Sequence, residues 1–315
     1  MIAQPAVALL SHTFNREDLF LSVFVLVDDW MVQNFGSGNL PRQTQMPDFT
    51  DSETLTVVLV GEMCHSKRNR AWLRQVRASH AYLFPQLPED SRFTRRAEKV
   101  CHLLPAFRRQ ILHWADADIK PVRLMDSFPL PLCANYRVLQ SSHPISGTSF
   151  GYCASKKQHY FGLHPLALMT EEGFVEDVFL APGNMGDSPL LSAYLSECER
   201  RGKDLIGQEW IGDKGFVGKV RQDWARAFLG VTLHIRQRDY RDWIPSFEKL
   251  LDRLRHPIEG FLSVLTTSFH LTDVLVKTDI GLYRRVEAKI TAFNLARYFN
   301  LVLGRQLSDV ARYAI

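Results

Sequence analysis

The segment RLMDSFPLPLC, residues 123–133, decides the fold class because a short apolar run in it ends in an aspartate. Residues 121–126 have the β-rich composition of a buried strand, and Ser127 and two prolines follow directly after Asp126. In open α/β sheets, ligands bind at the carboxyl ends of the strands, where this carboxylate is expected. A lone aspartate there is more often a turn former, so its role depends on which other acids reach the same edge.

Short β-rich runs alternate with helical patterns after residue 121. Further strands are predicted at 158–169, 174–180, 208–212 and 231–235. Helices are predicted at about 188–200, 217–229, 243–267 and 283–303. Residues 133–157 fit no element well and are expected to form a loop with a short strand. This order predicts an α/β fold, a mixed five-stranded sheet with helices on its faces.

The residues before 121 show no strand alternation and are predicted to be helical. Residues 16–34 are apolar on most faces, as in a buried helix, and their most hydrophobic stretch, 19–27, is too short to span a bilayer. Further helices are predicted over 69–79, where Trp72 and Leu73 should point into the core, and from about 91 to 117. We therefore expect a helical region over 1–118 and an α/β domain over 119–315.

A second helix has a clear start signal. Thr50 or Asp51 can cap its first turn, and Glu53 or Thr54 follows in that turn.

The chain carries 46% hydrophobic and 23% charged residues, typical of a globular protein with a core. Its net charge of +4 permits a nucleic-acid partner without requiring one.

The cysteines indicate a reducing compartment. They are scattered, five in number, and no two stand at metal-ligand spacing, so we interpret them as free thiols: Cys64, Cys101, Cys133, Cys153 and Cys198. Since residues 19–27 also lack the basic leader of a signal peptide, the protein is expected to be cytoplasmic and independent of membranes.

Three acids stand where such a fold would expose them together. Asp126 ends the first strand, Asp213 follows the fourth in WIGDKGF (210–216), and Glu259 lies early in a helix within LRHPIEGFLSVL (254–265). Clustered carboxylates repel one another, and a hard divalent cation such as Mg²⁺ removes that cost. Each acid also has an ordinary structural explanation. Asp213 could simply belong to a tight turn. Pro257 suits the first position of a helix, so Glu259 could be a first-turn charge that favours the helix dipole.

Several segments together resemble the DDE transposases of bacterial insertion sequences. They include MDSFPLPLC (125–133), residues 152–191, WIGDKGF and RHPIEGFLSVL (255–265). With LFPQLPEDSRFTRR (83–96), the pattern is most similar to the insertion-sequence family numbered 982, over roughly residues 45–300. The resemblance implies a ribonuclease-H-like catalytic domain over 119–315, preceded by a helical region that binds the ends of the element.

The resemblance also implies the chemistry of the site. Asp126, Asp213 and Glu259 become the catalytic residues and the ligands of two Mg²⁺ or Mn²⁺ ions, which cleave the transposon ends and transfer the strand into target DNA. Related transposases place Tyr, Arg and Lys around the glutamate. Here Arg255 fits the Arg, whereas Asp252 and Thr266 stand at the other two positions. The expected partners are double-stranded DNA, as terminal inverted repeats and target, and a second copy of the chain on DNA.

Basic residues supply candidate DNA contacts. The segment HSKRNRAWLRQVRAS, residues 65–79, contains no acid, and such a cluster can neutralise backbone phosphates, although a solvated helix face is the alternative. The helical region contributes Lys67, Arg68, Arg70, Arg74, Arg77, Arg95 and Arg96. The α/β domain contributes Lys156, Lys157, Lys214 and Arg255.

Other enzyme classes lack their motifs. The sequence has no G-x-x-x-x-G-K-[ST] loop, no G-x-S-x-G elbow and no H-E-x-x-H pair. Asp187 in PGNMGDSPLL is interpreted as the N-cap of the helix over 188–200, and His159 and His164 as structural. Two alternatives to a transposase stay open at this stage: a catalytically silent DNA-binding protein derived from one, and a metal-dependent nuclease without strand transfer.

Overall fold

The computed structural model describes seven ranges of the chain: 15–42, 45–66, 68–133, 145–153, 157–235, 257–274 and 276–313. The chain divides into two compact units. Unit 1 comprises Met1–Ala115 together with Leu265–Ile315, and unit 2 comprises Asp116–Val264. The observed boundary at 115 lies close to the predicted one at 118. Residues 265–315, however, were expected to belong to the α/β domain, and they group with the N-terminal helices instead.

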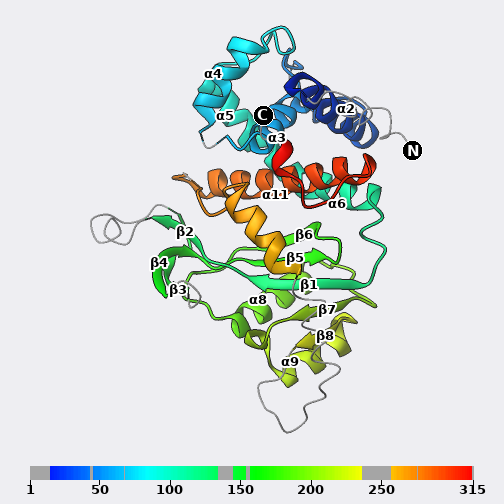
Figure 1. Ribbon diagram of the computed structural model, residues 1–315, viewed down its shortest axis with the longest axis vertical. Coiled ribbons are helices and arrows are strands. Elements are labelled where there is room, and N and C mark those ends of the chain that lie inside the picture. Colours follow the sequence, from blue (N-terminus) through cyan, green and yellow to red (C-terminus); the bar gives the residue numbers. More distant parts are fainter. Residues whose placement is uncertain are drawn as a thin grey trace. The chain divides into compact units, whose positions relative to one another are not determined.

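All the regular elements of unit 1 within its described residues are helices. Its α-helices (Figure 1) are α2 (Arg16–Phe35), α3 (Asp51–Met63), α4 (Asn69–Ser79), α5 (Asp90–Val100), α6 (Leu104–Trp114) and α11 (Asp279–Val302). The capping prediction is confirmed, because Thr50 and Glu53 form a reciprocal capping box at the start of α3. The helix predicted from 91 to 117 is instead broken at Cys101–Leu103 by a 3₁₀ turn. Pro105, which lacks a backbone N–H, stands in the first turn of α6.

Helix α11 explains why the C-terminal segment belongs to unit 1. It is buried along almost its whole length and packs against α3 and α6. Its buried charges are paired: the Glu62 carboxylate of α3 accepts hydrogen bonds from Arg285 Nη1 at 2.5 Å and Lys289 Nζ at 2.7 Å. Arg108 of α6 pairs in the same way with Glu287. Breaking such a pair leaves an uncompensated buried charge, so these contacts specify which helices are neighbours.

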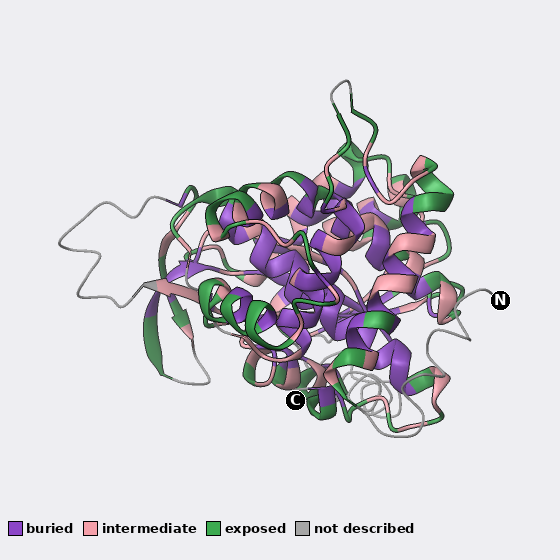
Figure 2. Ribbon diagram, turned by 90° about the horizontal axis from the view of Figure 1, so that it is seen from above, coloured by how far each residue is buried: buried purple, intermediate pink, exposed green. Residues whose placement is uncertain are grey.

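The core of unit 1 also fixes α4. Trp72 and Leu73 are buried as predicted, and Trp72 Nε1 donates to the Val57 carbonyl at 2.9 Å. Phe20 of α2 stacks on Trp72 with ring centroids 5.8 Å apart. Buried residues (purple in Figure 2) line the inner faces of these helices. Among the described residues, no helix is both long enough and apolar enough to cross a membrane.

Unit 2 contains the predicted mixed five-stranded sheet. The strand order is β6-β5-β1-β7-β8, in which β1 pairs antiparallel with β5 and parallel with β7. The bounds are β1 (Val122–Ser127), β5 (Leu166–Thr170), β6 (Val175–Phe179), β7 (Glu209–Gly212) and β8 (Thr232–Ile235). Helix α8 (Asp187–Arg200) packs Leu191, Tyr194 and Leu195 against Met125, Leu168 and Trp210 of the sheet. Residues 217–229, predicted as one helix, form α9 (Lys219–Trp224) and a π-helical turn, Ala225–Leu229.

A second, three-stranded sheet interrupts the predicted order. It consists of β2 (Leu130–Cys133), β4 (Gln158–Leu163) and β3 (Ser149–Cys153), in the order β2-β4-β3. The strand predicted over 158–169 therefore divides at His164 and Pro165: its first half pairs in this sheet and its second half pairs with β1. Proline cannot donate a ladder hydrogen bond, which favours the division at that point.

Among the side chains that the structure describes, four cysteines have free thiols, and burial raises the pKa of Cys64, Cys101 and Cys198 to about 11.

We expect His65 to make the protein less stable as the pH falls from 6.5 towards 4. Burial, together with the positive charges of His270 and Lys289, lowers the pKa of His65 to about 4, and Glu62 opposes this only in part. In that range the unfolded chain binds a proton at His65 and the folded chain does not, so acidification favours unfolding. Asparagine tolerates the positive φ of 54° at this position and does not titrate.

The thermal unfolding temperature of His65→Asn should therefore fall less between pH 6.5 and 4 than that of the wild type. An identical pH dependence of the two proteins would contradict this assignment.

Candidate active site at the ends of β1 and β7

Parallel pairing brings Asp126 and Asp213 to the same edge of the sheet in unit 2. Strand β1 pairs with β7 in the register Val122 with Glu209 and Leu124 with Ile211. Asp126 and Asp213 each stand two residues beyond this last pair, Asp126 near the end of β1 and Asp213 directly after β7. Both residues are half-buried, so a ligand can reach them. The register therefore sends both acids towards the same edge of the sheet, and their meeting there stays a prediction.

Asp213 stands where the chain leaves β7 in a tight turn. Its carboxylate caps a 3₁₀ turn, Lys214–Phe216, and accepts a hydrogen bond from the Lys214 backbone N–H at 2.7 Å. Gly212 lies directly over the Met125 side chain, where an added Cβ would be 2.4 Å from Met125 Cε. The turn interpretation of GDKG and the site interpretation are therefore compatible, because the turn itself presents the carboxylate at the strand end.

Asp187 joins the two strand ends, and this arrangement corrects its predicted role. The N-cap of α8 is Gly186, with no side-chain cap hydrogen bond, and Asp187 is the first helical residue. Its Oδ1 instead accepts a hydrogen bond of 2.6 Å from Ser127 Oγ. The Ser127 backbone N–H donates to Asp126 Oδ1 at 2.9 Å, so one serine connects both carboxylates. The negative charge of Asp187 also suits the first turn of a helix.

The other side of the Asp187 carboxylate faces the turn that carries Asp213. A Cβ added at Gly215 would be 2.2 Å from Asp187 Oδ2 and 3.0 Å from its Cγ, so only glycine allows this approach. His164 Nε2 lies 3.8 Å from Asp187 Oδ1, while its Nδ1 is 2.7 Å from the Met185 carbonyl. Sequence reasoning missed Ser127 and His164 because their partners lie 60 and about 20 residues away, and no local pattern encodes such contacts.

Glu259 is exposed on a helix that the structure describes over residues 257–267. The residues before Pro257 lie outside the described ranges, so the helix-start alternative for Glu259 stays a prediction. The Phe261 ring of that helix lies against Gly173, with Cε2 at 2.6 Å from an added Cβ. Gly173 belongs to the β5–β6 turn, beyond the start of β1, since Arg123 of β1 pairs with Thr170. Within the described ranges, no three His, Cys, Asp or Glu residues form a group that could hold a metal ion.

A comparison with protein-family models decides the affiliation of the chain. Residues 118–295, more than half of the sequence, match the model described as "Transposase DDE domain". The chain belongs to the DDE transposase family. Comparisons with curated proteins and with solved structures gave no match. The matched range begins just before β1 and ends within α11, so it includes Asp126, Asp213 and Glu259.

The predicted basic contacts of this transposase-family chain differ in their surroundings. Arg68, Arg74 and Arg95 are exposed in unit 1, and Lys157 and Lys214 are exposed in unit 2. Arg70 and Arg77 of α4 both contact Asp90 of α5, at 3.3 and 2.7 Å, so an acid outside the segment partly neutralises them. Lys67, Lys156 and Arg255 lie outside the described residues.

Arg96 has a structural role. Its guanidinium donates to Asp51 Oδ1 at 2.9 and 3.1 Å, and the Asp51 carboxylate is fully buried. This pair ties α5 to the beginning of α3. The sequence suggested a phosphate contact because Arg96 continues a basic run, but the helical periodicity turns it inward. We therefore do not propose Arg96 as a DNA contact.

Replacing Gly215 by alanine should destabilise unit 2 by about 1–3 kcal/mol, the usual cost of overpacking. The new methyl group would press on Oδ2, Cγ and Cβ of Asp187, so a side-chain rotation alone cannot relieve the clash. Gly186→Ala is the matched control, because a Cβ there meets only Pro189 Cδ at 4.0 Å. Urea unfolding of the two variants tests this; equal stability would show that Asp187 and the turn are not in contact.

Proposed function

We propose that this protein is a DNA transposase that cleaves DNA at the ends of its element and joins the freed strands to target DNA. The observation that carries the proposal is that Asp126 and Asp213 stand at the carboxyl ends of two paired, parallel strands of a DDE transposase-family chain. Acids at adjacent strand ends are expected where a ligand binds at the carboxyl edge of a sheet. The ribonuclease-H-like fold and membership of the family numbered 982 are parts of the same proposal, supported by the strand order and by the sequence resemblance.

The residues present fit a hard divalent cation. Mg²⁺ is commonly held by one or two carboxylates together with substrate phosphates, and Asp126 and Asp213 offer half-buried oxygen donors at one edge. We assign Mg²⁺ or Mn²⁺ to these two residues, with Glu259 as the third predicted ligand and two ions expected. When bound, such an ion polarises the scissile phosphate and lowers the pKa of an attacking water.

The chain itself contributes orientation and charge. Ser127 fixes the Asp126 carboxylate through its backbone N–H and donates a hydrogen bond from its hydroxyl to Asp187, which holds the end of β1 against the turn of Asp213. This arrangement keeps the two acids in place before DNA arrives, which reduces the reorganisation needed for reaction. Exposed basic side chains in both units would bind the phosphate backbone. A homodimer on DNA and a cytoplasmic location complete the proposal, the first by analogy with the family.

Removing either aspartate should abolish cleavage and spare DNA binding. Asp126→Asn and Asp213→Asn keep the shape of the side chain and lose the charge. We expect them to lower Mg²⁺-dependent cleavage of end DNA by about 100-fold or more, because a bound metal supplies several kcal/mol of charge stabilisation. Glu259→Gln tests the third predicted ligand. Glu209→Gln, an exposed acid at the opposite end of β7, should cleave like the wild type.

The products distinguish the alternatives when end DNA, target DNA and Mg²⁺ are supplied together. Joined end and target DNA supports a transposase, whereas cleavage without joining supports a nuclease. A mobility shift without cleavage, in protein that is folded by circular dichroism, would leave only a DNA-binding protein and would refute the proposed chemistry. Terminal inverted repeats flanking the coding region would provide the end DNA for this assay.

Exposed arginines of unit 1 should contribute to DNA affinity in a salt-dependent way. Arg74 of α4 is exposed and has no ion pair among the described residues. We expect Arg74→Gln to weaken end binding and to reduce the slope of log affinity against log salt concentration by about 1, as for one lost phosphate contact. Arg200→Gln in unit 2, where Arg200 is already paired with Glu197, is the control. An unchanged slope in Arg74→Gln would place the DNA elsewhere.

A further inference from the structure

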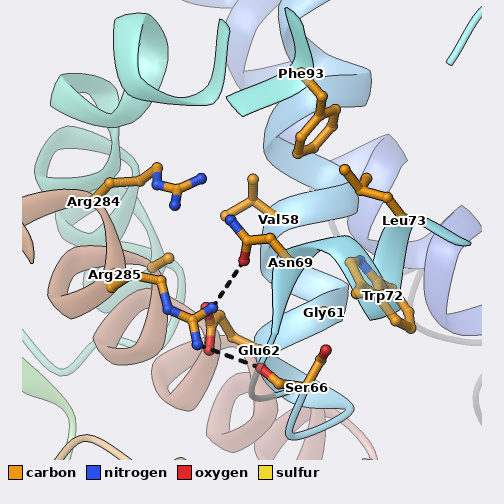
Figure 3. A pocket seen from close by; sticks show the side chains of 11 residues that line it. Val58, Gly61, Glu62, Ser66, Asn69, Trp72, Leu73, Phe93, Arg284 and Arg285 are labelled. Carbon is orange, nitrogen blue, oxygen red and sulfur yellow. Dashed lines mark hydrogen bonds and ion pairs between the residues drawn. The ribbon is translucent and has the colours of Figure 1, made fainter. Parts of the chain in front are cut away.

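A small cavity in unit 1 is lined by more positive than negative charge. It lies among α3, the beginning of α4 and α11, and Figure 3 shows Arg284 and Arg285 reaching into it from α11. Glu62, Ser66, Asn69 and the Trp72 ring form the rest of the polar and aromatic wall. All of these residues belong to unit 1, and the cavity is separate from the acids of unit 2.

The negative charge in the wall is already neutralised. Glu62 accepts from both Arg285 and Lys289, and Lys289 donates as well to the Phe269 carbonyl at 2.8 Å. Arg285 also donates to Asn69 Oδ1 at 3.2 Å, as the dashed line in Figure 3 marks. One carboxylate therefore faces two cations, so its single negative charge is already exceeded before a third cation is counted.

Arg284 is that third cation. It is only 6% exposed, and its Nε is a buried donor with no hydrogen-bond partner. Across the described residues, Arg284 forms no hydrogen bond and no ion pair; Glu62 and Glu98 act on it only through longer-range attraction. Burial lowers its pKa, since desolvation disfavours the cation. Leaving a guanidinium buried and unpaired costs several kcal/mol, which an anionic occupant would offset.

The beginning of α4 supplies a second feature of an anion site. The N-cap residue of this helix, Arg68, makes no side-chain cap hydrogen bond, and no acid occupies the first turn. Asn69, the first residue of α4, lines the cavity. Helix N-termini present backbone N–H groups and a positive partial charge, so they favour anions, most of all beside an arginine.

We propose that Arg284 is the centre of an anion-binding site that takes a phosphate oxygen. The cavity itself has a volume of ≈ 10 Å³, which admits one oxygen-sized atom rather than a nucleotide. A phosphate group would insert a single oxygen towards the Arg284 guanidinium and keep its other oxygens at the mouth, near Ser66 and Asn69. Guanidinium groups suit phosphate because their planar donors match its oxygens. The phosphate comes either from free inorganic phosphate or from the DNA backbone, and only the second source rests on the proposed function.

Thermal unfolding of the full chain in phosphate tests the site directly. Potassium phosphate should raise the unfolding temperature of the wild type by about 2–4 °C at roughly ten times its Kd. Potassium chloride at the same ionic strength should not. Arg284→Met, which replaces the cation by an apolar side chain of similar length, should unfold at the wild-type temperature or above it in phosphate-free buffer and should lose the phosphate response. Arg312→Met, a partly exposed arginine paired with Asp309, is the matched control and should respond like the wild type.

DNA binding then separates the two sources of phosphate. If a backbone phosphate is the occupant, Arg284→Met weakens end binding, lowers the salt slope by about 1, and free phosphate competes with DNA. If free phosphate is the occupant, end binding by Arg284→Met is unchanged while the phosphate response is lost. Equal stabilisation of the wild type by phosphate and chloride, together with unchanged DNA binding by Arg284→Met, would overturn the proposal, and so would a full phosphate response in Arg284→Met.

The same titration keeps this proposal distinct from the proposed function. Asp126→Asn, which lies in unit 2, should show the full phosphate response whether or not it cleaves DNA. A wild-type protein that responds to phosphate but never cleaves DNA would refute only the transposase chemistry. Should Arg284→Met fail to fold, two measurements still test the site. One is the comparison of phosphate with chloride on the wild type. The other is the Arg284→Lys variant, which lacks the planar guanidinium and should be stabilised less by phosphate.

Discussion

The parallel pairing of β1 with β7 is the constraint on which the candidate site depends. Its register pairs Leu124 with Ile211, so Asp126 and Asp213, each two residues further on, leave the pair towards the same edge of the sheet although 86 residues separate them along the chain. A slip by one residue would turn one of the two side chains to the other face of the sheet. Burial of the sheet against α8 prevents such a slip, since Met125 and Trp210 would lose their places in the core. Hydrophobic packing of the sheet on α8 therefore holds the backbone positions of the two acids. The hydrogen bond between Ser127 and Asp187 adds a polar contact at the same strand end.

Buried charges play the corresponding role in unit 1. Helix α11 buries five charged residues, and apolar periodicity alone would not place them there: Arg284, Arg285, Glu287, Lys289 and Arg297. Glu62 and Arg108 form direct pairs with three of them, and Arg297 donates to the Leu307 carbonyl at 3.2 Å. Arg284 is the remaining one, and its buried Nε has no hydrogen-bond partner among the described residues. In this unit, charge complementarity thus specifies the helix neighbours.

Much of the secondary structure could be predicted from the sequence, because it depends on local signals. The capping box at Thr50, the helix over 69–79 and the two acids that follow β-rich runs all rest on nearby residues. The errors arose where distant contacts decide. Asp187 is drawn to Ser127 instead of capping α8, Arg96 turns inward to Asp51, and α11 joins the N-terminal helices through Glu62. The strand predicted over 158–169 divides because its halves pair with different partners, which no window of sequence reveals. The predicted approach of Glu259 to the two aspartates likewise depends on where a whole helix docks, and it stays a prediction.

Unit 1 is assembled from the two ends of the chain, with unit 2 inserted between them in the sequence. A ribosome therefore releases the complete sheet of unit 2 well before α11 exists, and the first helices must wait with Glu62 and Arg108 uncompensated. A polypeptide interrupted after residue 264 would retain both aspartates yet lack the helix that completes the N-terminal core. Such a product would leave uncovered the faces of α3 and α6 on which α11 packs in the full chain.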